Sequence, residues 1–390
     1  MRVLVCPSGF KGSISSHTAA DCIEEGILRA IPTAAVRKVP LADGGEGFAR
    51  ALVDATGGQI RRVHVTGPTG YLIPSYYGIL GGESKTAVVE IAAAAGLSLV
   101  PPGYRNPCIT TTFGVGQLIA AALEEDVRRI IVGCGDSGTS DGGAGMLQAL
   151  GARLIDINGD ELPLAGGGEA LVSLADIDFS GIDSRLKKVR IEVVCNWQNV
   201  LCGLYGVAHV YGPQKGANPQ ETEILATALD VYASVAERMI GQSVSNAPGS
   251  GASGGLGTGL LLIGAELRPR YEAIMQYFNI DSLFDDCDLI ITAEGAIDYQ
   301  TPRGKIPAEI ATRARKYGKP VIVLAGSIGD NADANYDVGI NAYVSILQRP
   351  STLHEAIEGA ERLLVESAEG AMRMVMVGRT LNGSFVNKPK

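Results

Sequence analysis

The sequence predicts an α/β fold of two domains, one with a parallel sheet assembled from both chain ends and a second domain inserted between them. Three observations lead to this prediction. A strand-loop-helix order occurs twice at the N-terminus, the same alternation returns near Asp281, and the stretch between them follows another pattern. There, short alternating runs are separated by Gly and Pro turns.

The N-terminal segment begins with the apolar run "RVLVC" at residues 2–6, which is typical of a buried strand. After a Gly/Ser loop, Ala19, Ile23 and Ile27 recur at helical spacing and predict a helix with one apolar face. The run "AVRKVPL" at residues 35–41 then leads through "ADGGEG" into a second helical pattern. This repeated order is the start of an α/β sheet.

The middle of the chain predicts antiparallel hairpins from residue 63 onward, because Gly and Pro turns separate short alternating runs. Residues 130–134 ("IIVGC") and 191–195 ("IEVVC") are apolar enough to be buried strands. The Gly-rich stretch at 246–267 predicts a loop that enters a helix. Trp197, the single tryptophan, is expected to fill the core.

Near the C-terminus three further apolar strands alternate with helical patterns. With the two N-terminal strands they make five, which predicts one parallel sheet. The predicted domains are residues 1–62 with 282–390 and, inserted, residues 63–281, and we expect the active site in the cleft between them. The three strands are "DLIIT", "PVIVLAG" and "AYVSI", and the last helix is expected to place Leu353, Ile357, Ala360 and Leu364 on one side.

Composition excludes several classes of partner. The net charge of −9 and the 5% aromatic content argue against nucleic acid and anionic membranes, so small molecules are the expected ligands. No apolar run reaches the roughly 18 residues of a membrane span, and the N-terminus lacks the pattern of a secretory signal, so a cytoplasmic location is expected. Seven cysteines without CxxC spacing predict reduced packing residues.

Polar, glycine-rich loops follow most of the predicted strands. Loops at the carboxyl ends of strands in an open α/β sheet converge on one crevice. Bare backbone N–H groups bind phosphate, carboxylates hold Mg²⁺, and lysine offsets phosphoryl charge. The Walker and dinucleotide-binding sequences are missing, which disfavours those two classes. The loops are "PSGFKGS", "LADGGEG", "GCGDSGTSDGG", "CNWQN" and "TAEGAIDYQTPRGK", and "GPQKG" adds a lysine in a tight turn.

These motifs resemble those of the type I bacterial glycerate kinases, in order and near the same spacing, over nearly the whole chain. The resemblance implies ATP- and Mg²⁺-dependent phosphorylation of D-glycerate to 2-phosphoglycerate. It also implies a flavodoxin-like parallel sheet built from both chain ends and an inserted α/β domain with a mixed sheet. The matching segments are "FKGS", "ADGGEG", "TSDGGAGM", "GPQKGA", "PGSGASGGLG", "AEGAID" with "QTPRGK", and "LAGS".

Carried over residue by residue, the resemblance implies three sets of site residues. We expect Asp141 with the Gly142–Gly143 backbone at phosphate and metal, and Lys11 and Lys215 on phosphoryl oxygens. Asp43 or Asp298 is expected near the acceptor hydroxyl. The catalytic set is Lys11, Asp43, Asn196 and Asp298; the binding set is Ser8, Ser13, Glu46, Ser137, Thr139, Gly142, Gly143, Lys215, Arg303 and Lys305; and the metal set is Asp141 and Glu294.

Three departures from the family pattern lie in these loops. Ser8 and Asn196 stand where the family usually has aspartate, and Ala296 stands where it has arginine. Three functions therefore remain open: a glycerate kinase in which the remaining acids and Arg303 compensate, a kinase for another small hydroxy acid or polyol, and a nucleotide- or metabolite-binding protein with little catalysis. A kinase is favoured, and a homodimer is considered.

Overall fold

The computed structural model describes residues 1–10, 12–41, 44–83 and 85–385, with side chains omitted at 303 and 382–385. The chain forms two compact units. We call Met1–Ala42 with Met275–Lys390 the terminal unit, and Asp43–Ile274 the central unit. Each unit is described by itself.

The boundaries of these units fall earlier in the chain than the predicted 62/63 and 281/282. Helix α2 (Phe48–Thr56) accounts for the first difference, because it packs against β3, β4 and β5 of the central unit. Leu52 and Val53 are buried on its apolar face, and a Cβ atom at Gly78 of β4 would lie 2.5 Å from Val53. The sequence shows the apolar face of this helix but not the sheet that it covers.

The terminal unit contains a five-stranded parallel sheet in the order β13-β12-β11-β1-β2. The N-terminal strand lies inside this sheet, with Val3 paired to Leu289 on one side and to Val36 on the other. The prediction of one parallel sheet assembled from both chain ends is therefore confirmed. Its strands are β1 (Arg2–Val5), β2 (Ala35–Lys38), β11 (Leu289–Ile297), β12 (Val321–Ile328) and β13 (Ala342–Ser345).

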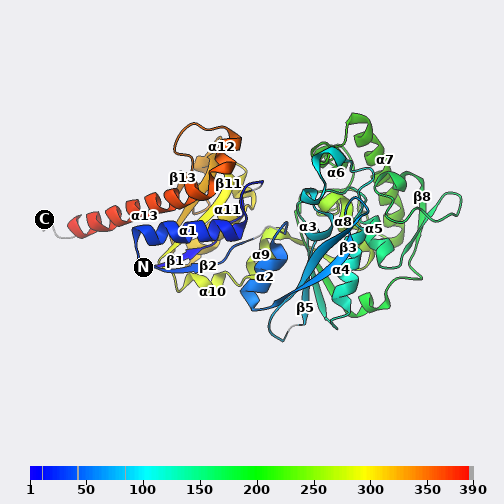
Figure 1. The fold of residues 1–390 in the computed structure, drawn as a ribbon, viewed down its shortest axis with the longest axis horizontal. Helices are drawn as coiled ribbons and strands as arrows, with labels where there is room; N and C mark the ends of the chain where they lie inside the picture. The colour runs from blue at the N-terminus through cyan, green and yellow to red at the C-terminus, as the bar shows by residue number, and fades with distance from the viewer. Residues whose placement is uncertain (11, 42–43, 84, 386–390) are drawn as a thin grey trace. The chain divides into compact units, whose positions relative to one another are not determined.

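Two helices from opposite chain ends run side by side in this unit, α1 (Ser16–Ala30) and α13 (Ala360–Phe385) (Figure 1). Gly26 of α1 allows this close approach, since a Cβ atom there would lie 2.3 Å from the carbonyl oxygen of Val365. The other helices of the terminal unit are α10 (Asp281–Phe284), α11 (Ile306–Lys316) and α12 (Leu353–Glu358), and α9 (Arg270–Tyr277) spans the boundary between the units.

The prediction of a single last helix is wrong, because the chain forms two helices there. The chain forms α12 and then α13, with Gly359 between them. Leu353 is 78% exposed and Ile357 37% exposed, whereas Ala360 and Leu364 are buried. A capping box at Thr352 starts the short helix independently of α13, so the apolar spacing on the two sides of Gly359 does not form one face.

The central unit is built on a mixed six-stranded sheet in the order β10-β9-β6-β5-β4-β3. The pairs β3–β4 and β4–β5 are antiparallel and the others are parallel, which confirms the predicted hairpin and the mixed sheet. The strands are β3 (Gln59–Thr66), β4 (Leu72–Ile79), β5 (Thr86–Glu90), β6 (Arg129–Gly133), β9 (Arg190–Cys195) and β10 (Glu266–Pro269), and β7 (Arg153–Asp156) pairs separately with β8 (Leu174–Asp178).

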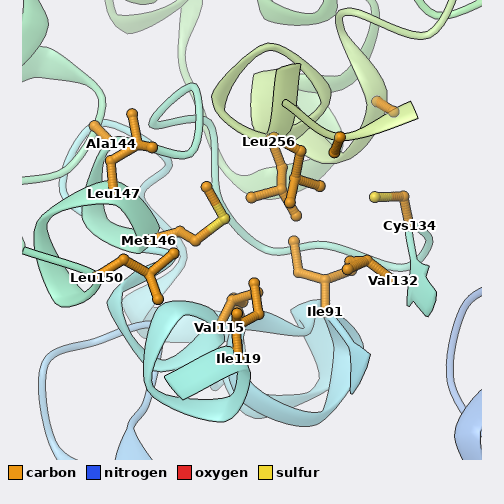
Figure 2. Close-up of a cluster of buried hydrophobic side chains, with 14 of the residues drawn as sticks. Ile91, Val115, Ile119, Val132, Cys134, Ala144, Met146, Leu147, Leu150 and Leu256 are labelled. Atoms are coloured by element: carbon orange, nitrogen blue, oxygen red, sulfur yellow. The ribbon is translucent and has the colours of Figure 1, made fainter. Parts of the chain in front are cut away.

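Helices pack on this mixed sheet and enclose the core of the unit. Figure 2 shows Ile91, Val132 and Met146 in this core, with Val115 and Leu256 from two of the helices. Trp197 is 41% exposed, so its expected place in the core is wrong. The helices are α3 (Ala92–Ala95), α4 (Phe113–Leu123), α5 (Ala144–Ala149), α6 (Val207–Tyr211), α7 (Pro219–Ile240) and α8 (Ala252–Leu262).

Within the described ranges, no helix combines the length and the apolar character that crossing a bilayer requires.

We expect Gly26→Ala to destabilise the terminal unit by about 1–3 kcal/mol, because the added methyl forces α1 away from α13. Gly370→Ala is the matched control, since Gly370 also lies inside a helix but has open space where the Cβ would be. This control should gain roughly 0.5–1 kcal/mol from the higher helix propensity of alanine. Urea unfolding of the two variants measures the difference, and equal effects would contradict the close contact.

Candidate active site

The predicted site residues are distributed over both units. Lys11 and Asp43 lie outside the described residues, and Arg303 is described for its backbone alone, in the short turn Thr301–Arg303. The predicted roles of these three side chains stay predictions.

The glycine-rich loop at 134–143 follows β6, and other chain segments contact its backbone closely. A Cβ atom at Gly135 would lie 2.6 Å from the Cα of Gly45, and one at Gly254 would lie 2.0 Å from the carbonyl oxygen of Thr139. At Gly142 it would lie 2.6 Å from the ring of Tyr232. Side chains at these positions would push the segments apart, so the bare backbone in this stretch serves contact between chain segments.

The backbone N–H groups of Gly142 and Gly143 are already used as donors. Gly142 donates to the carbonyl oxygen of Gly254 at 3.0 Å, and Gly143 donates to Oδ1 of Asp141 at 3.2 Å. Both glycines are buried. This corrects the expectation that their N–H groups are open to a phosphate, which arose because a sequence does not show whether a donor already has an acceptor.

Asp141 is fully buried, and protein donors surround its carboxylate. Oδ2 accepts from the N–H of Thr112 at 2.7 Å, from its hydroxyl at 2.8 Å and from the N–H of Gly145 at 3.2 Å. Burial raises the pKa of Asp141, while the bonds from Thr112, Gly143 and Gly145 oppose that rise. This geometry favours a structural role for Asp141 over the predicted role as a metal ligand, because its oxygens already hold the two loops together.

Lys215 brings two of the predicted binding residues together. It ends the short turn Pro213–Lys215 and is 3% exposed. Its ammonium donates to the hydroxyl of Ser137 at 3.0 Å and to the carbonyl oxygen of Thr139 at 2.5 Å. The hydroxyls of Thr139 and Ser140 are buried, and within the described part of the chain neither has a hydrogen-bond partner. A buried cation from one turn thus lies against a loop that carries two buried hydroxyls.

A second loop of the central unit, residues 44–47, contacts this first one. The N–H of Glu46 donates to Oδ2 of Asp136 at 3.2 Å, and the side chain of Glu46 is exposed. Asp136 adopts a positive φ of 51°, which aspartate tolerates better than most residues. Asp136 was not predicted as a site residue. Its place between Gly135 and Ser137 in a loop was the available signal, because aspartate next to glycine often makes a turn.

Asn196 follows β9 and is half-buried. Its Oδ1 accepts from the N–H of Gln198 at 3.1 Å, which closes a local turn. An amide cannot accept a proton as a carboxylate does. We therefore expect Asn196 to shape the loop after β9 or to bind a ligand through hydrogen bonds.

In the terminal unit, Ser8 and Glu294 meet where β1 and β11 lie side by side. The Ser8 hydroxyl lies 2.9 Å from Oε2 of Glu294 and 2.8 Å from the carbonyl oxygen of Ala293. Ser8 is buried and Glu294 half-buried. The neighbouring predicted residue Ser13 has a buried hydroxyl with no partner among the described residues. The contact places a predicted metal ligand against a predicted binding residue.

Asp298 and Lys305 also meet in the terminal unit. Oδ1 of Asp298 accepts from the N–H of Gln300 at 2.8 Å and lies 3.9 Å from the ammonium of Lys305. That ammonium donates to the carbonyl oxygen of Ala296 at 2.9 Å. Both side chains are about one-quarter exposed, at 26% and 28%. A cation therefore lies next to the position where the expected arginine is replaced by alanine.

Across the described residues, no three or more His, Cys, Asp or Glu side chains are grouped so that they could hold a metal ion by themselves. Proteins usually bind Mg²⁺ through one or two carboxylates together with substrate phosphates. Glu294 and Asp298 are half-buried carboxylates, which suits a site of that kind.

We expect Asp141→Ala to destabilise the central unit by about 3–5 kcal/mol, because three backbone N–H groups lose a buried charged acceptor. Asp141→Asn keeps one acceptor oxygen, so its loss of stability should be smaller than that of Asp141→Ala. Asp160→Ala, at an exposed aspartate of the same unit, is the control and should stay within about 0.5 kcal/mol of wild type. Thermal unfolding measures all three variants. An Asp141→Ala protein of wild-type stability without activity would instead favour the metal role.

The sequence as a whole matches known proteins over nearly its full length. Residues 3–376 match the model of the glycerate kinase family. The chain is 44% identical over 382 residues to a glycerate kinase of Bacillus subtilis, covering 98% of this chain and 99% of the relative. It is 42% identical over 379 residues to the glycerate 2-kinase of Escherichia coli, covering 97% and 99%.

A solved structure agrees with these relatives. The crystal structure of a Salmonella typhimurium LT2 protein assigned to glycerate kinase 2 matches with a TM-score of 0.81 and 42% identity. The match covers 97% of this chain and 99% of that one. This chain belongs to the glycerate kinase family.

Proposed function

We propose that this protein is an ATP- and Mg²⁺-dependent kinase that transfers the γ-phosphoryl group of ATP to a hydroxyl of D-glycerate and forms 2-phosphoglycerate. The observation that carries the proposal is the buried Lys215 ammonium on the loop of Ser137 and Thr139. Membership in the family supports the same activity. The proposed place of action is the cytoplasm, and a homodimer remains a prediction.

Catalysis of phosphoryl transfer depends more on positive charge near the phosphoryl group than on a covalent intermediate. The reason is that the transition state spreads negative charge over the oxygens of the transferred phosphoryl group. We assign this task in the central unit to Lys215, whose burial strengthens its electrostatic effect. The hydroxyls of Ser137 and Thr139 lie on the loop that Lys215 contacts, and we propose that they bind phosphate oxygens. Lys11 keeps its predicted role on the phosphoryl group.

The acceptor hydroxyl loses its proton when its oxygen bonds to phosphorus and the bond between the β- and γ-phosphates of ATP breaks. We propose Asp298 or Asp43 to take that proton, since each is a carboxylate in a predicted site loop. Glu294 is our candidate for holding Mg²⁺. When bound, Mg²⁺ neutralises the charge of the phosphates.

A substrate with a carboxylate group needs a cation in the protein to bind that group, and we propose Lys305 for this role. Its ammonium contacts the carbonyl oxygen of Ala296, next to the position of the missing arginine. Lysine offers a point charge rather than the paired donors of a guanidinium, so recognition of the carboxylate is expected to be looser. This feature also favours the second candidate function, a kinase for another small hydroxy acid or polyol.

One assay separates these functions. The purified protein is incubated with ATP, Mg²⁺ and a panel of small hydroxy acids and polyols, and the release of ADP is followed. Release with D-glycerate, together with 2-phosphoglycerate as product, supports the proposal. Faster release with another acceptor supports the second function. No acceptor-dependent release with any compound would contradict both and favour a binding protein with little catalysis.

We expect Lys215→Met to lower kcat by about 10²- to 10⁴-fold while the protein stays folded, because methionine keeps an extended apolar side chain but removes the charge. Lys188→Met is the matched control, since Lys188 belongs to the same unit and is exposed. Steady-state kinetics and circular dichroism measure the two variants. Near-normal turnover of Lys215→Met would contradict the role of this cation.

We expect the double substitution Asn196→Asp with Ala296→Arg to discriminate between the two kinase functions. If another compound is the acceptor, the double variant should phosphorylate glycerate faster and the true acceptor more slowly. If Lys305 and the remaining acids already serve glycerate, wild type should phosphorylate it well and the variant should gain little. Comparison of kcat/KM for glycerate with kcat/KM for the best other acceptor gives the answer.

A further inference from the structure

Glu90 is a buried carboxylate that none of the motifs indicates. It ends β5 and is 0% exposed. Its Oε1 accepts from the hydroxyl of Tyr76 at 2.6 Å and from the N–H of Gly47 at 3.2 Å, and its Oε2 accepts from the N–H of Ala49 at 2.7 Å. A glutamate this deep in a protein is rare unless strong partners satisfy it, and here all three donors are neutral.

Two of these donors belong to the start of α2. The helix begins at Phe48, and its N-cap residue Gly47 has no side chain to accept a hydrogen bond from the first turn. Glu90 supplies that acceptor from β5, in the way that a serine or aspartate N-cap usually does from within the chain. Its negative charge also lies at the positive end of the helix dipole. The start of α2 is therefore fixed by a strand far away in sequence.

The loop at 44–47 depends on the same contacts, because it leads directly into α2. On its other side, Glu46 donates to Asp136, and Gly45 lies against Gly135. Glu90 thus holds one end of the loop while the loop at 134–143 contacts the other. The held segment carries Glu46, a predicted binding residue, and follows Asp43 in the chain.

Tyr76 fixes the Glu90 carboxylate in turn. The guanidinium of Arg50 lies 4.8 Å from the centre of the Tyr76 ring. A cation–π contact on the ring and the hydrogen bond from the hydroxyl to Glu90 therefore both orient Tyr76. Burial and the nearby charge of Glu90 raise the pKa of Tyr76, which keeps its hydroxyl protonated as a donor. Burial also raises the pKa of Glu90, and the bonds from Tyr76, Ala49 and Gly47 oppose that rise.

We propose that Glu90, oriented by Tyr76, is a positioning residue for phosphoryl transfer that sets the place of the loop at 44–47 through the first turn of α2. This inference rests on the proposed kinase function. It adds a residue that acts through the loop and does not itself touch the substrates.

Glu90→Gln tests the proposal with the smallest change in shape. The amide oxygen can still accept from Ala49, but the amide NH₂ then faces the N–H of Gly47, and two donors cannot bond to each other. We expect kcat/KM to fall about 10- to 100-fold, with the KM for glycerate or ATP rising severalfold, and the Tm to stay within a few degrees of wild type. A role in stability alone would lower the Tm and the active fraction but leave both KM values unchanged.

Two neighbouring tyrosines of β4 provide matched variants. Tyr76→Phe removes one donor to Glu90 and should raise the same KM by a smaller factor. Tyr77→Phe is the control, because the hydroxyl of Tyr77 lies 3.4 Å from Glu125 and 3.3 Å from the carbonyl oxygen of Ala121. Its kinetic constants should equal those of wild type.

Hydrogen exchange gives a measurement that does not depend on activity. In Glu90→Gln the amides of Gly47 and Ala49 should exchange at least 10-fold faster, while those of β5 and β6 should keep their protection. A folded Glu90→Gln protein with wild-type KM, kcat and exchange would overturn the proposal. If that variant does not fold, wild-type kinetics and exchange in Tyr76→Phe would overturn it.

Failure of the proposed kinase function can be told apart from failure of the proposal for Glu90. If wild type phosphorylates no compound of the panel, the catalytic part of the inference falls with the kinase function. Faster exchange at Gly47 and Ala49 in Glu90→Gln would then still support the contact that holds the loop. Unchanged exchange would overturn that contact as well.

Discussion

Contact between bare backbones around residues 134–143 is the constraint on which the candidate site of the central unit depends. Segments that are distant in sequence meet this loop at Gly45 and at Gly254, where even one added methyl group would overlap backbone atoms. Because the backbones touch, the side chains on this loop are carried on a support that has little room to move. The contact between Lys215 and Ser137 forms on that support, so the glycines position these polar groups.

Two buried carboxylates strengthen this support. Asp141 accepts from the backbone of the Thr112 segment and from its own loop, and Glu90 accepts from the start of α2. An ionised group in the interior requires such donors, since burial without them costs several kcal/mol. Glu294 and Asp298 differ, because both are only half-buried and an oxygen of each lies near a polar side-chain group, a serine hydroxyl or a lysine ammonium. Asp141 and Glu90 hold backbone from the interior, whereas the half-buried Glu294 and Asp298 stay our candidates for the chemistry, although Oδ1 of Asp298 also accepts from a backbone N–H.

Patterns within one segment could be predicted from the sequence. The apolar runs predicted the parallel sheet of the terminal unit and the hairpin of the central unit, because strand burial depends mainly on local composition. The mixed sheet was implied by the resemblance to the glycerate kinases. The break at Gly359 escaped prediction, since the apolar spacing continues through it. Asp141 was recognised as important, but only the fold shows which way its oxygens face. Glu90 gave no signal, because its function depends on a pairing between β5 and α2 that no local pattern records.

The three departures from the family pattern can be understood as a change in charge. Replacing two aspartates by Ser8 and Asn196 removes two negative charges, and replacing an arginine by Ala296 removes one positive charge. At Ser8 the consequence is visible, because its hydroxyl donates to Glu294 where a second carboxylate would have repelled it. At Ala296 the ammonium of Lys305 donates to the backbone carbonyl oxygen, so a cation lies beside this position. The serine at position 8 therefore avoids a second carboxylate beside Glu294, and Lys305 supplies a cation beside Ala296.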